Sequence, residues 1–370
     1  MNAPADQTRL IKRLRIALVL VAMFTGICIV VVLGVLFYWN SFLLEQPKSD
    51  PFTRGPFVAD VSADSAIVRF LGPDPATVTL VAAAPDGTTV EAEGGVFRGL
   101  EAGQRYIWTA VIDGAGRASG SFQTAPEEPD APVTFGVIGD YGSGNEHEYA
   151  VGRGLAAIDP AFTVTTGDNS YLLALPQVLN RNIFKPLLGV MQEGPLVVTL
   201  GDHDTFYDDG KAITDAIGMP GAGLLYTWEH GPVQIIILGN QGDAASIAYA
   251  NAELAKPFDG VRFATVHTPL QPGDPLADVL RGKVAAVFSG HLHRQERRIV
   301  DGVLAITAGT GGKGPGNEEF TKQTAEAVFS TMDYGFVRVQ VTTKESVIQF
   351  IDEAGRVRDS VTVPRSTAAS

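Results

Sequence analysis

Residues 133–142 read VTFGVIGDYG, an apolar run rich in β-branched residues that ends in glycine and aspartate. Such a run predicts a buried β-strand, and the Gly-Asp pair predicts a turn at its carboxyl end. The pattern recurs in AFTVTTGD (161–168), PLVVTLGD (195–202), RFATVH (262–267) and KVAAVFSGH (283–291). If these strand ends meet at one edge of a sheet, their carboxylate and imidazole side chains form a candidate metal site.

Side chains that can donate to a metal ion stand in or directly after these runs. They are Asp140, Asp168, Tyr171, Asp202, His267, His291 and His293. This set is larger than one catalytic ion with open positions requires, so it suits two ions bridged by a carboxylate. Mixed carboxylate and imidazole ligands favour iron, manganese or zinc over magnesium or calcium. A phenolate from Tyr171, a hard donor, would favour Fe(III).

Each motif taken alone has a simpler explanation. Gly-Asp pairs are common in turns after strands, His267 could be a buried core histidine, and Tyr171 could be a packed aromatic. The repetition of Gly-Asp in register with GHLH (290–293) favours a ligand role for all of them.

In chain order, GDYG, GDNSY, GDHD, the FATVH strand end and GHLH resemble the calcineurin-like metallophosphoesterase superfamily. The likeness is strongest to its purple acid phosphatases, which read GDxG, GDxxY, GNH(D/E), VxxH and GHxH. Gly142 stands where most of the superfamily has a histidine, and Tyr171 is gained, an exchange that purple acid phosphatases share. The resemblance covers about residues 55–363 and implies a metal-dependent hydrolase of phosphate monoesters.

The resemblance also implies a role for each donor. Fe(III) would be held by Asp140, Asp168, Tyr171 and His293. The second, divalent ion (zinc, manganese or iron) would be held by Asp202, His267 and His291, with Asp168 bridging. A metal hydroxide would then attack phosphorus in line, without a covalent phosphoenzyme.

Two further residues of the third motif receive catalytic roles from the same resemblance. His203 would hydrogen-bond the phosphate or the leaving group, and Asp204 would orient His203.

The chain departs from the family pattern at three places. Asp202 replaces the usual asparagine, Phe263 replaces the valine of VxxH, and no histidine follows His267 closely. These departures leave two alternatives open: a phosphodiesterase or pyrophosphatase, with a lipid-linked substrate as one case, and a non-catalytic surface protein.

A glycine-rich stretch, TGGKG (310–314), follows the last motif. It lacks the earlier glycine and the Ser or Thr after Lys313 that a P-loop requires. The loop could line the pocket, and turn chemistry explains it equally well.

The pattern outside the motifs predicts the domain organisation. Short alternating runs over 56–125 predict a fibronectin type III-like β-sandwich, with Tyr106 as its corner tyrosine. Three prolines mark a hinge at 126–132, after which strand-like and helix-like stretches alternate. Helices are expected at 147–157, 178–191, 244–256 and 274–281. Residues 133–363 are therefore expected to form an α/β domain, arranged as an α/β/β/α metallophosphoesterase sandwich.

The N-terminal region predicts a membrane anchor. Residues 16–39 carry no charge, four basic residues stand within 1–15, and 40–55 read as a linker. The positive-inside rule places 1–15 in the cytoplasm and the catalytic domain outside it, in the periplasm or at the cell surface. A cleaved signal peptide is the alternative, but the apolar run is longer than such a peptide needs.

The charge and cysteine content restrict the partners. The net charge of −13 argues against nucleic acid, and it means that local cations must attract any phosphate ester. The single cysteine, Cys28, lies in the apolar run, so disulfides play no part. The oligomeric state is not encoded in any of these patterns.

Overall fold

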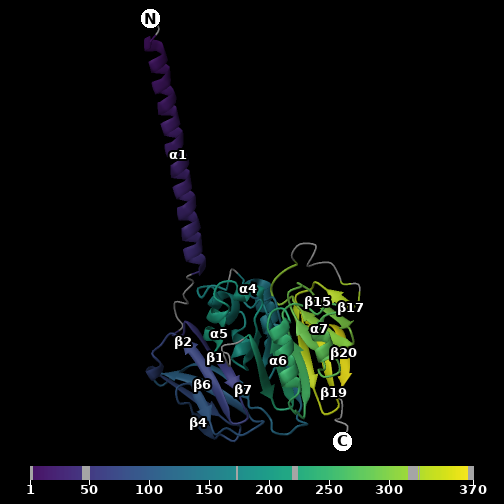
Figure 1. Ribbon diagram of the computed structural model, residues 1–370. Coiled ribbons are helices and arrows are strands. Elements are labelled where there is room, and N and C mark those ends of the chain that lie inside the picture. Colours follow the sequence, from purple (N-terminus) through teal and green to yellow (C-terminus); the bar gives the residue numbers. More distant parts are fainter. Residues whose placement is uncertain are drawn as a thin grey trace. The chain divides into compact units, whose positions relative to one another are not determined.

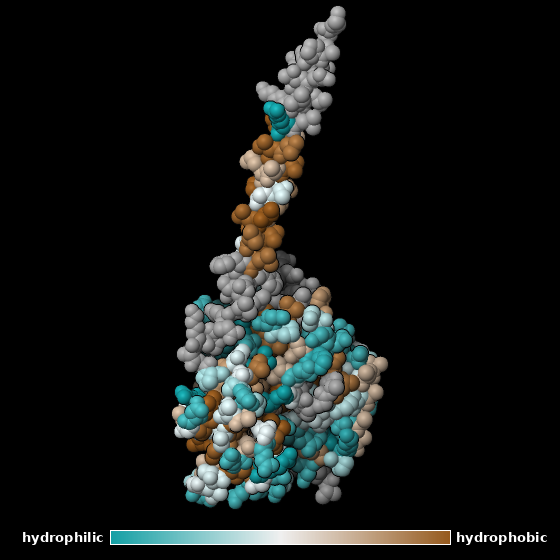
Figure 2. All heavy atoms as spheres, turned by 90° about the vertical axis from the view of Figure 1, so that its left-hand side faces the viewer, coloured by the Kyte–Doolittle hydropathy of each residue, from teal (hydrophilic) through white to brown (hydrophobic). Residues whose placement is uncertain are grey.

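The computed structural model describes residues 3–43, 51–171, 174–218, 224–315, 324 and 326–365. The chain divides into two compact units, Met1–Lys48 and Ser49–Ser370. The described part of the first unit is one helix, α1 (Ala3–Leu43), and its segment Arg15–Leu36 is long and apolar enough to cross a membrane, with a mean hydropathy of 3.1. Figure 2 shows the apolar side chains along this segment. Length and composition thus agree with the predicted anchor, while its topology stays a prediction.

Two sheets stacked face to face form the central layers of the second unit's larger domain (Figure 1). The first has the strand order β10 (Leu196–Thr199), β9 (Thr163–Thr166), β8 (Val133–Ile138), β18 (Gly335–Val341), β19 (Glu345–Asp352) and β20 (Val357–Pro364). The second has the order β11 (Leu225–His230), β12 (Val233–Leu238), β13 (Val261–Thr265), β14 (Val287–Ser289), β16 (Val303–Ala308), β15 (Gln295–Val300) and β17 (Ala327–Thr331). Strands β8, β9 and β10 are parallel, as are β12, β13, β14 and β16.

Buried aromatic side chains fill the space between the two sheets. Phe135 stacks on Phe162 at 4.8 Å and meets the edge of Phe263 at 5.3 Å, so the strands of both sheets interlock. Strands such as β9, β10 and β12 are buried at every position, as parallel strands covered on both faces are.

Helices cover the two outer faces. One apolar cluster joins the outer face of the first sheet to α2 (Glu146–Ala156), α3 (Leu188–Met191) and α5 (Lys211–Ile217). Another joins the second sheet to α6 (Ala244–Leu254) and α7 (Pro275–Leu280). The layers are therefore α/β/β/α, as the sequence predicts.

The stretch 178–191 reads as one helix in the sequence but forms two short pieces. A π-helix, η2 (Asn180–Phe184), is followed by α3. Pro186 stands between them and cannot donate a backbone hydrogen bond, so it interrupts the helix.

Residues 54–123 form two small antiparallel sheets around one apolar cluster. One has the order β1 (Arg54–Val61), β2 (Ser65–Leu71) and β5 (Val96–Arg98); the other has β4 (Thr89–Glu91), β3 (Val78–Ala83), β6 (Arg105–Ile112) and β7 (Ala115–Gln123). The Tyr106 hydroxyl accepts a hydrogen bond from the Glu101 backbone N–H at 2.9 Å. The likeness to fibronectin type III domains, and the domain boundaries, stay predictions.

The small sheets pack directly against the larger domain. The Gln192 carbonyl accepts hydrogen bonds from the Ser121 backbone N–H at 3.0 Å and from the Trp108 indole at 3.1 Å. The indole of Trp228 donates to Asp60 Oδ1 at 3.1 Å. Since these bonds cross between the two parts, they restrict the hinge predicted at 126–132.

A buried histidine at the end of β11 predicts acid sensitivity. His230 stacks on Trp228 and is 1% exposed, and burial lowers its pKa from 6.5 to about 4. Because the folded state holds His230 neutral, this residue does not reduce the free energy of unfolding above pH 6.5. As the pH falls below 6.5, His230 takes up a proton more readily in the unfolded state, which lowers the free energy of unfolding. The loss levels off below about pH 4.

We expect the free energy of unfolding of His230→Phe to fall less on acidification than that of the wild type. The difference should reach about 3 kcal/mol at pH 4. Urea unfolding of the full chain in detergent at pH 7, 5.5 and 4.5 would measure this. Parallel pH profiles for the variant and the wild type would contradict it.

Candidate metal centre

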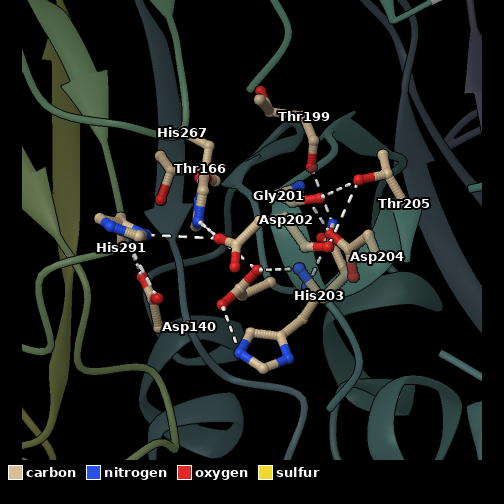
Figure 3. Close-up of polar contacts among 12 residues, drawn as sticks. Asp140, Thr166, Thr199, Gly201, Asp202, His203, Asp204, Thr205, His267 and His291 are labelled. Atoms are coloured by element: carbon tan, nitrogen blue, oxygen red, sulfur yellow. Dashed lines mark hydrogen bonds and ion pairs between the residues drawn. The ribbon is translucent and has the colours of Figure 1, made fainter. Parts of the chain in front are cut away.

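The ends of five strands from both sheets meet at one place. Asp140 follows β8, Asp168 follows β9, and Asp202 begins the short helix α4 (Asp202–Thr205) after β10. His267 follows β13 and His291 follows β14, both in the second sheet. Figure 3 shows the side chains of Asp202, His267 and His291 pointing toward one another. The carboxyl ends of parallel strands thus supply the predicted donors.

Two groups of potential ligands form around His267. Its Nε2 lies 3.0 Å from Asp202 Oδ1 and 3.4 Å from Asp168 Oδ1. In the first group, Asp202, His267 and His291, all ligand atoms lie within 4.8 Å of one another. The second group, Asp140, Asp168 and His267, meets the same limit. His267 therefore belongs to both groups, whereas the family resemblance implies that it binds the second ion alone.

The remaining predicted donors lie beside Asp140. The Tyr171 hydroxyl is 3.4 Å from Asp140 Oδ1 and 3.3 Å from His293 Nε2. His293 Nε2 is 3.7 Å from Asp140 Oδ1. All seven predicted donors are thus brought together.

His203 lies at the open side of this cluster. Its imidazole Nε2 is 4.0 Å from Asp168 Oδ2, and its side chain is 48% exposed. Its backbone N–H donates to Asp168 Oδ1 at 3.1 Å, and its ring meets that of Tyr171 at 4.8 Å. The imidazole can therefore reach a molecule that enters from solvent.

The backbone is held in a rare conformation at three of the donors. Asp140, Asp168 and His291 have φ of 52°, 53° and 65°, the left-handed region that side chains with a Cβ seldom adopt. Such residues gather at functional sites, where the surrounding structure holds them. This conformation turns the chain sharply as each strand ends.

Glycines before the donors allow close approach. A Cβ at Gly201 would collide with the Asp168 carboxylate, and one at Gly290 would collide with the Asp140 carboxylate. The glycine that precedes the ligand in these motifs is therefore a packing requirement.

The pKa shifts of the clustered carboxylates and of His267 show that positive charge stabilises this site. Burial, with the nearby charge of Asp168 contributing, raises the pKa of Asp140 well above its ordinary value. Although burial opposes it, the hydrogen bond to Asp202 and the charges of Asp168 and Asp140 raise the pKa of His267 to about 10. Hydrogen bonds from His267 and His291 lower the pKa of Asp202. In the protein alone a proton on His267 balances these carboxylates, and cations could take over that task.

Tyr171 fits the same interpretation. Burial and the neighbouring carboxylates raise the pKa of its phenol well above 10. A phenolate at this position therefore needs a cation beside it. The donor set, buried oxygens and imidazoles at short distances, fits a metal centre.

A contact that the motifs do not reveal orients His267. Its Nδ1 lies 2.8 Å from the Thr166 carbonyl oxygen, so Nδ1 keeps a proton in both ionisation states of the ring, and Nε2, which faces the site, is the nitrogen that a metal ion can bind. This partner is a backbone atom of another strand, and no side-chain pattern could have indicated it.

The contacts of Asp204 correct its predicted role. Its carboxylate is fully buried and accepts backbone N–H groups from Gly201 at 2.9 Å, Asn169 at 3.1 Å and Ser170 at 3.0 Å. It also accepts from the Asn169 side chain at 2.6 Å. Both oxygens are engaged by these groups rather than by His203. Asp204 therefore fastens the second motif to the third, a positioning role, instead of orienting His203.

We expect Asp204→Ala to lower the free energy of unfolding by about 3 kcal/mol, because it leaves several buried N–H groups without an acceptor. Urea unfolding of the full chain in detergent would measure the loss. Asp208→Ala is the matched control, since Asp208 accepts one N–H, from Ala212 at 2.9 Å. It should cost about 1 kcal/mol. An equal cost for the two variants would contradict the fastening role.

Comparison with known proteins shows which class has this fold. No protein-family profile matches the chain, and no curated protein sequence does. Among solved structures, purple acid phosphatase PPD1 from yellow lupin (Lupinus luteus) seeds has a TM-score of 0.69 at 12% identity, covering 85% of this chain and 75% of that one. PhoD has a TM-score of 0.60 at 14% identity, covering 86% of this chain and 90% of that one. GAP50, described as the anchor in the inner membrane complex of Plasmodium, has a TM-score of 0.52 at 15% identity, covering 64% of this chain and 90% of that one.

At these identities the likeness is one of fold. The chain has the fold of the purple acid phosphatases and PhoD, and the resemblance stated from the motifs is confirmed at that level.

Proposed function

We propose that this chain is a metal-dependent hydrolase of phosphate monoesters with a dinuclear centre. The observation that carries the proposal is the gathering of all seven predicted donors, which form two overlapping ligand groups at the strand ends. The similarity in fold to a purple acid phosphatase supports it.

The donors divide between two ions in this proposal. Asp140, Asp168, Tyr171 and His293 would hold Fe(III). Asp202, His267 and His291 would hold zinc, manganese or iron, and Asp168 would bridge. When bound, the cations would neutralise phosphate oxygens and lower the pKa of a coordinated water.

The chain's own residues would orient the substrate and move a proton. His203 would donate a proton to the leaving oxygen, a role that its half-exposed position beside Asp168 supports. Its backbone N–H is fixed on Asp168 Oδ1, so the imidazole keeps its place relative to the bridging carboxylate. Asp202 adds a negative charge that an asparagine would not, which weakens the attraction for an anionic ester.

Removal of the bridging carboxylate tests the centre. We expect Asp168→Ala to lower nitrophenyl phosphate hydrolysis on the order of 10³-fold and to reduce the bound metal per chain. The assay uses the full chain in detergent, loaded with iron and zinc. Asp215→Ala is the control, because Asp215 is exposed on α5 and pairs with Lys211. Full activity of Asp168→Ala would end the proposal.

The phenolate assignment has a spectroscopic test. A phenolate bound to Fe(III) transfers charge to the metal and absorbs visible light, so iron loading should colour the protein. We expect Tyr171→Phe to lose this band. Tyr141→Phe should keep it, since the Tyr141 hydroxyl bonds to Asn169 Oδ1 at 2.8 Å instead. A band that survives in Tyr171→Phe would remove Tyr171 from the ligand set.

A second candidate keeps the metals and changes the substrate to a diester or pyrophosphate. The extra charge of Asp202 favours the diester, because a monoanion is repelled less than a dianion. The apolar helix motivates a lipid-linked substrate and a catalytic domain outside the cytoplasm. The ratio of diester to monoester hydrolysis separates the two candidates. A non-catalytic surface role is the weakest candidate, since every predicted ligand position here keeps a donor atom.

A further inference from the structure

The glycine-rich loop after β16 is fastened to the first motif. The Gly311 N–H donates to the Gly139 carbonyl at 2.9 Å, and the Lys313 N–H donates to the Asp140 carbonyl at 2.7 Å. The Asn145 side chain donates to the Gly312 carbonyl at 2.7 Å. These bonds fix the backbone of Lys313 against that of a proposed metal ligand.

Close packing leaves this loop little freedom. A Cβ at Gly311 would collide with Ile138 and Tyr141, and one at Gly312 would collide with Tyr141 and Glu148. The glycines therefore let the loop lie flat on the first motif, and Lys313 is the first residue after them whose side chain can extend.

The Lys313 side chain reaches the metal-donor cluster. It is half-buried, and its Nζ lies 4.6 Å from the centre of the Tyr171 ring. The hydroxyl of that ring contacts Asp140 and His293. Within the described part of the chain, no carboxylate forms an ion pair with Lys313. A half-buried ammonium without a carboxylate partner is a good place for an anion to bind.

The surroundings make this charge important. The chain has a net charge of −13, and Asp140, Asp168 and Asp202 crowd the site. Residues 268–290 contain no histidine, so that segment adds no imidazole for a phosphate group. Lys313 therefore brings an ammonium group to the site from the protein itself.

We propose that Lys313 is a specificity-determining residue that binds the phosphate group and favours dianionic monoesters over monoanionic diesters. The inference rests on the proposed function and adds the substrate class. A fixed cation attracts the second negative charge of a monoester, which a diester lacks. Lys313 would thus oppose the effect of Asp202 on the same anion.

A purely structural role makes a different prediction. If Lys313 only supported the Tyr171 ring through its cation–π contact, its loss would slow both kinds of ester alike and would disturb the metal content. A role in recognition would change the ratio between the esters and leave the metals in place.

The test compares Lys313→Met and Lys313→Arg with the wild type. The full chain in detergent is loaded with iron and zinc, and kcat/KM is measured for nitrophenyl phosphate and bis(nitrophenyl) phosphate. Orthophosphate binding is measured by calorimetry and metal content by elemental analysis. Lys344→Met, which removes an exposed lysine in the turn between β18 and β19, is the matched control.

We expect Lys313→Met to lower the monoester-to-diester ratio and to weaken orthophosphate binding, each by roughly tenfold or more, with unchanged metal content. Lys313→Arg should restore most of both, and the control should match the wild type. Equal losses for the two esters, or unchanged orthophosphate binding, would overturn the inference while the proposed function stands. A wild type that binds metals but hydrolyses neither ester would refute the proposed function, and the inference with it.

Discussion

The structure of the site depends on one electrostatic constraint: several carboxylates must be buried within a few ångströms of one another. Asp140, Asp168 and Asp204 are almost completely buried, and burial raises the pKa of Asp140 and of Asp204, the latter to about 7. Each carboxylate raises the cost of ionising the next. Such an arrangement persists only where the backbone holds it and where positive charge offsets it.

The backbone meets the first requirement with features that would be unfavourable elsewhere. Left-handed residues at the strand ends cost energy, and the strands that precede them are locked into a core of stacked aromatic rings. Asp204 joins two of these turns by accepting hydrogen bonds from their N–H groups, so its carboxylate holds the turns together. The rigid sheets therefore stabilise a strained edge, and the edge holds the donors.

The sequence predicted what periodicity and local chemistry encode. Apolar runs ending in Gly-Asp or Gly-His placed the donors at strand ends, and the alternation of β and α stretches predicted the layers. The single helix predicted at 178–191 is wrong, because Pro186 interrupts it, and this proline is a local signal that the sequence carries. The role of Asp204 could not be foreseen in the same way. Its partners include Asn169 and Ser170, which lie more than thirty residues away, and only the fold brings them together.

The second requirement is positive charge, and three kinds of group can supply it: a proton, a metal ion and the side chain of Lys313. In the protein alone a proton on His267 balances the carboxylates, and a metal ion would displace that proton, so binding of metal and loss of a proton are linked. Neither source is a fixed property of the fold. Lys313 differs, because its ammonium group belongs to a loop whose backbone is hydrogen-bonded to the first motif. A site that uses exchangeable metal ions for its chemistry can thus use a lysine of the chain itself to recognise the substrate. This separation would allow substrate preference to change without altering the ligands.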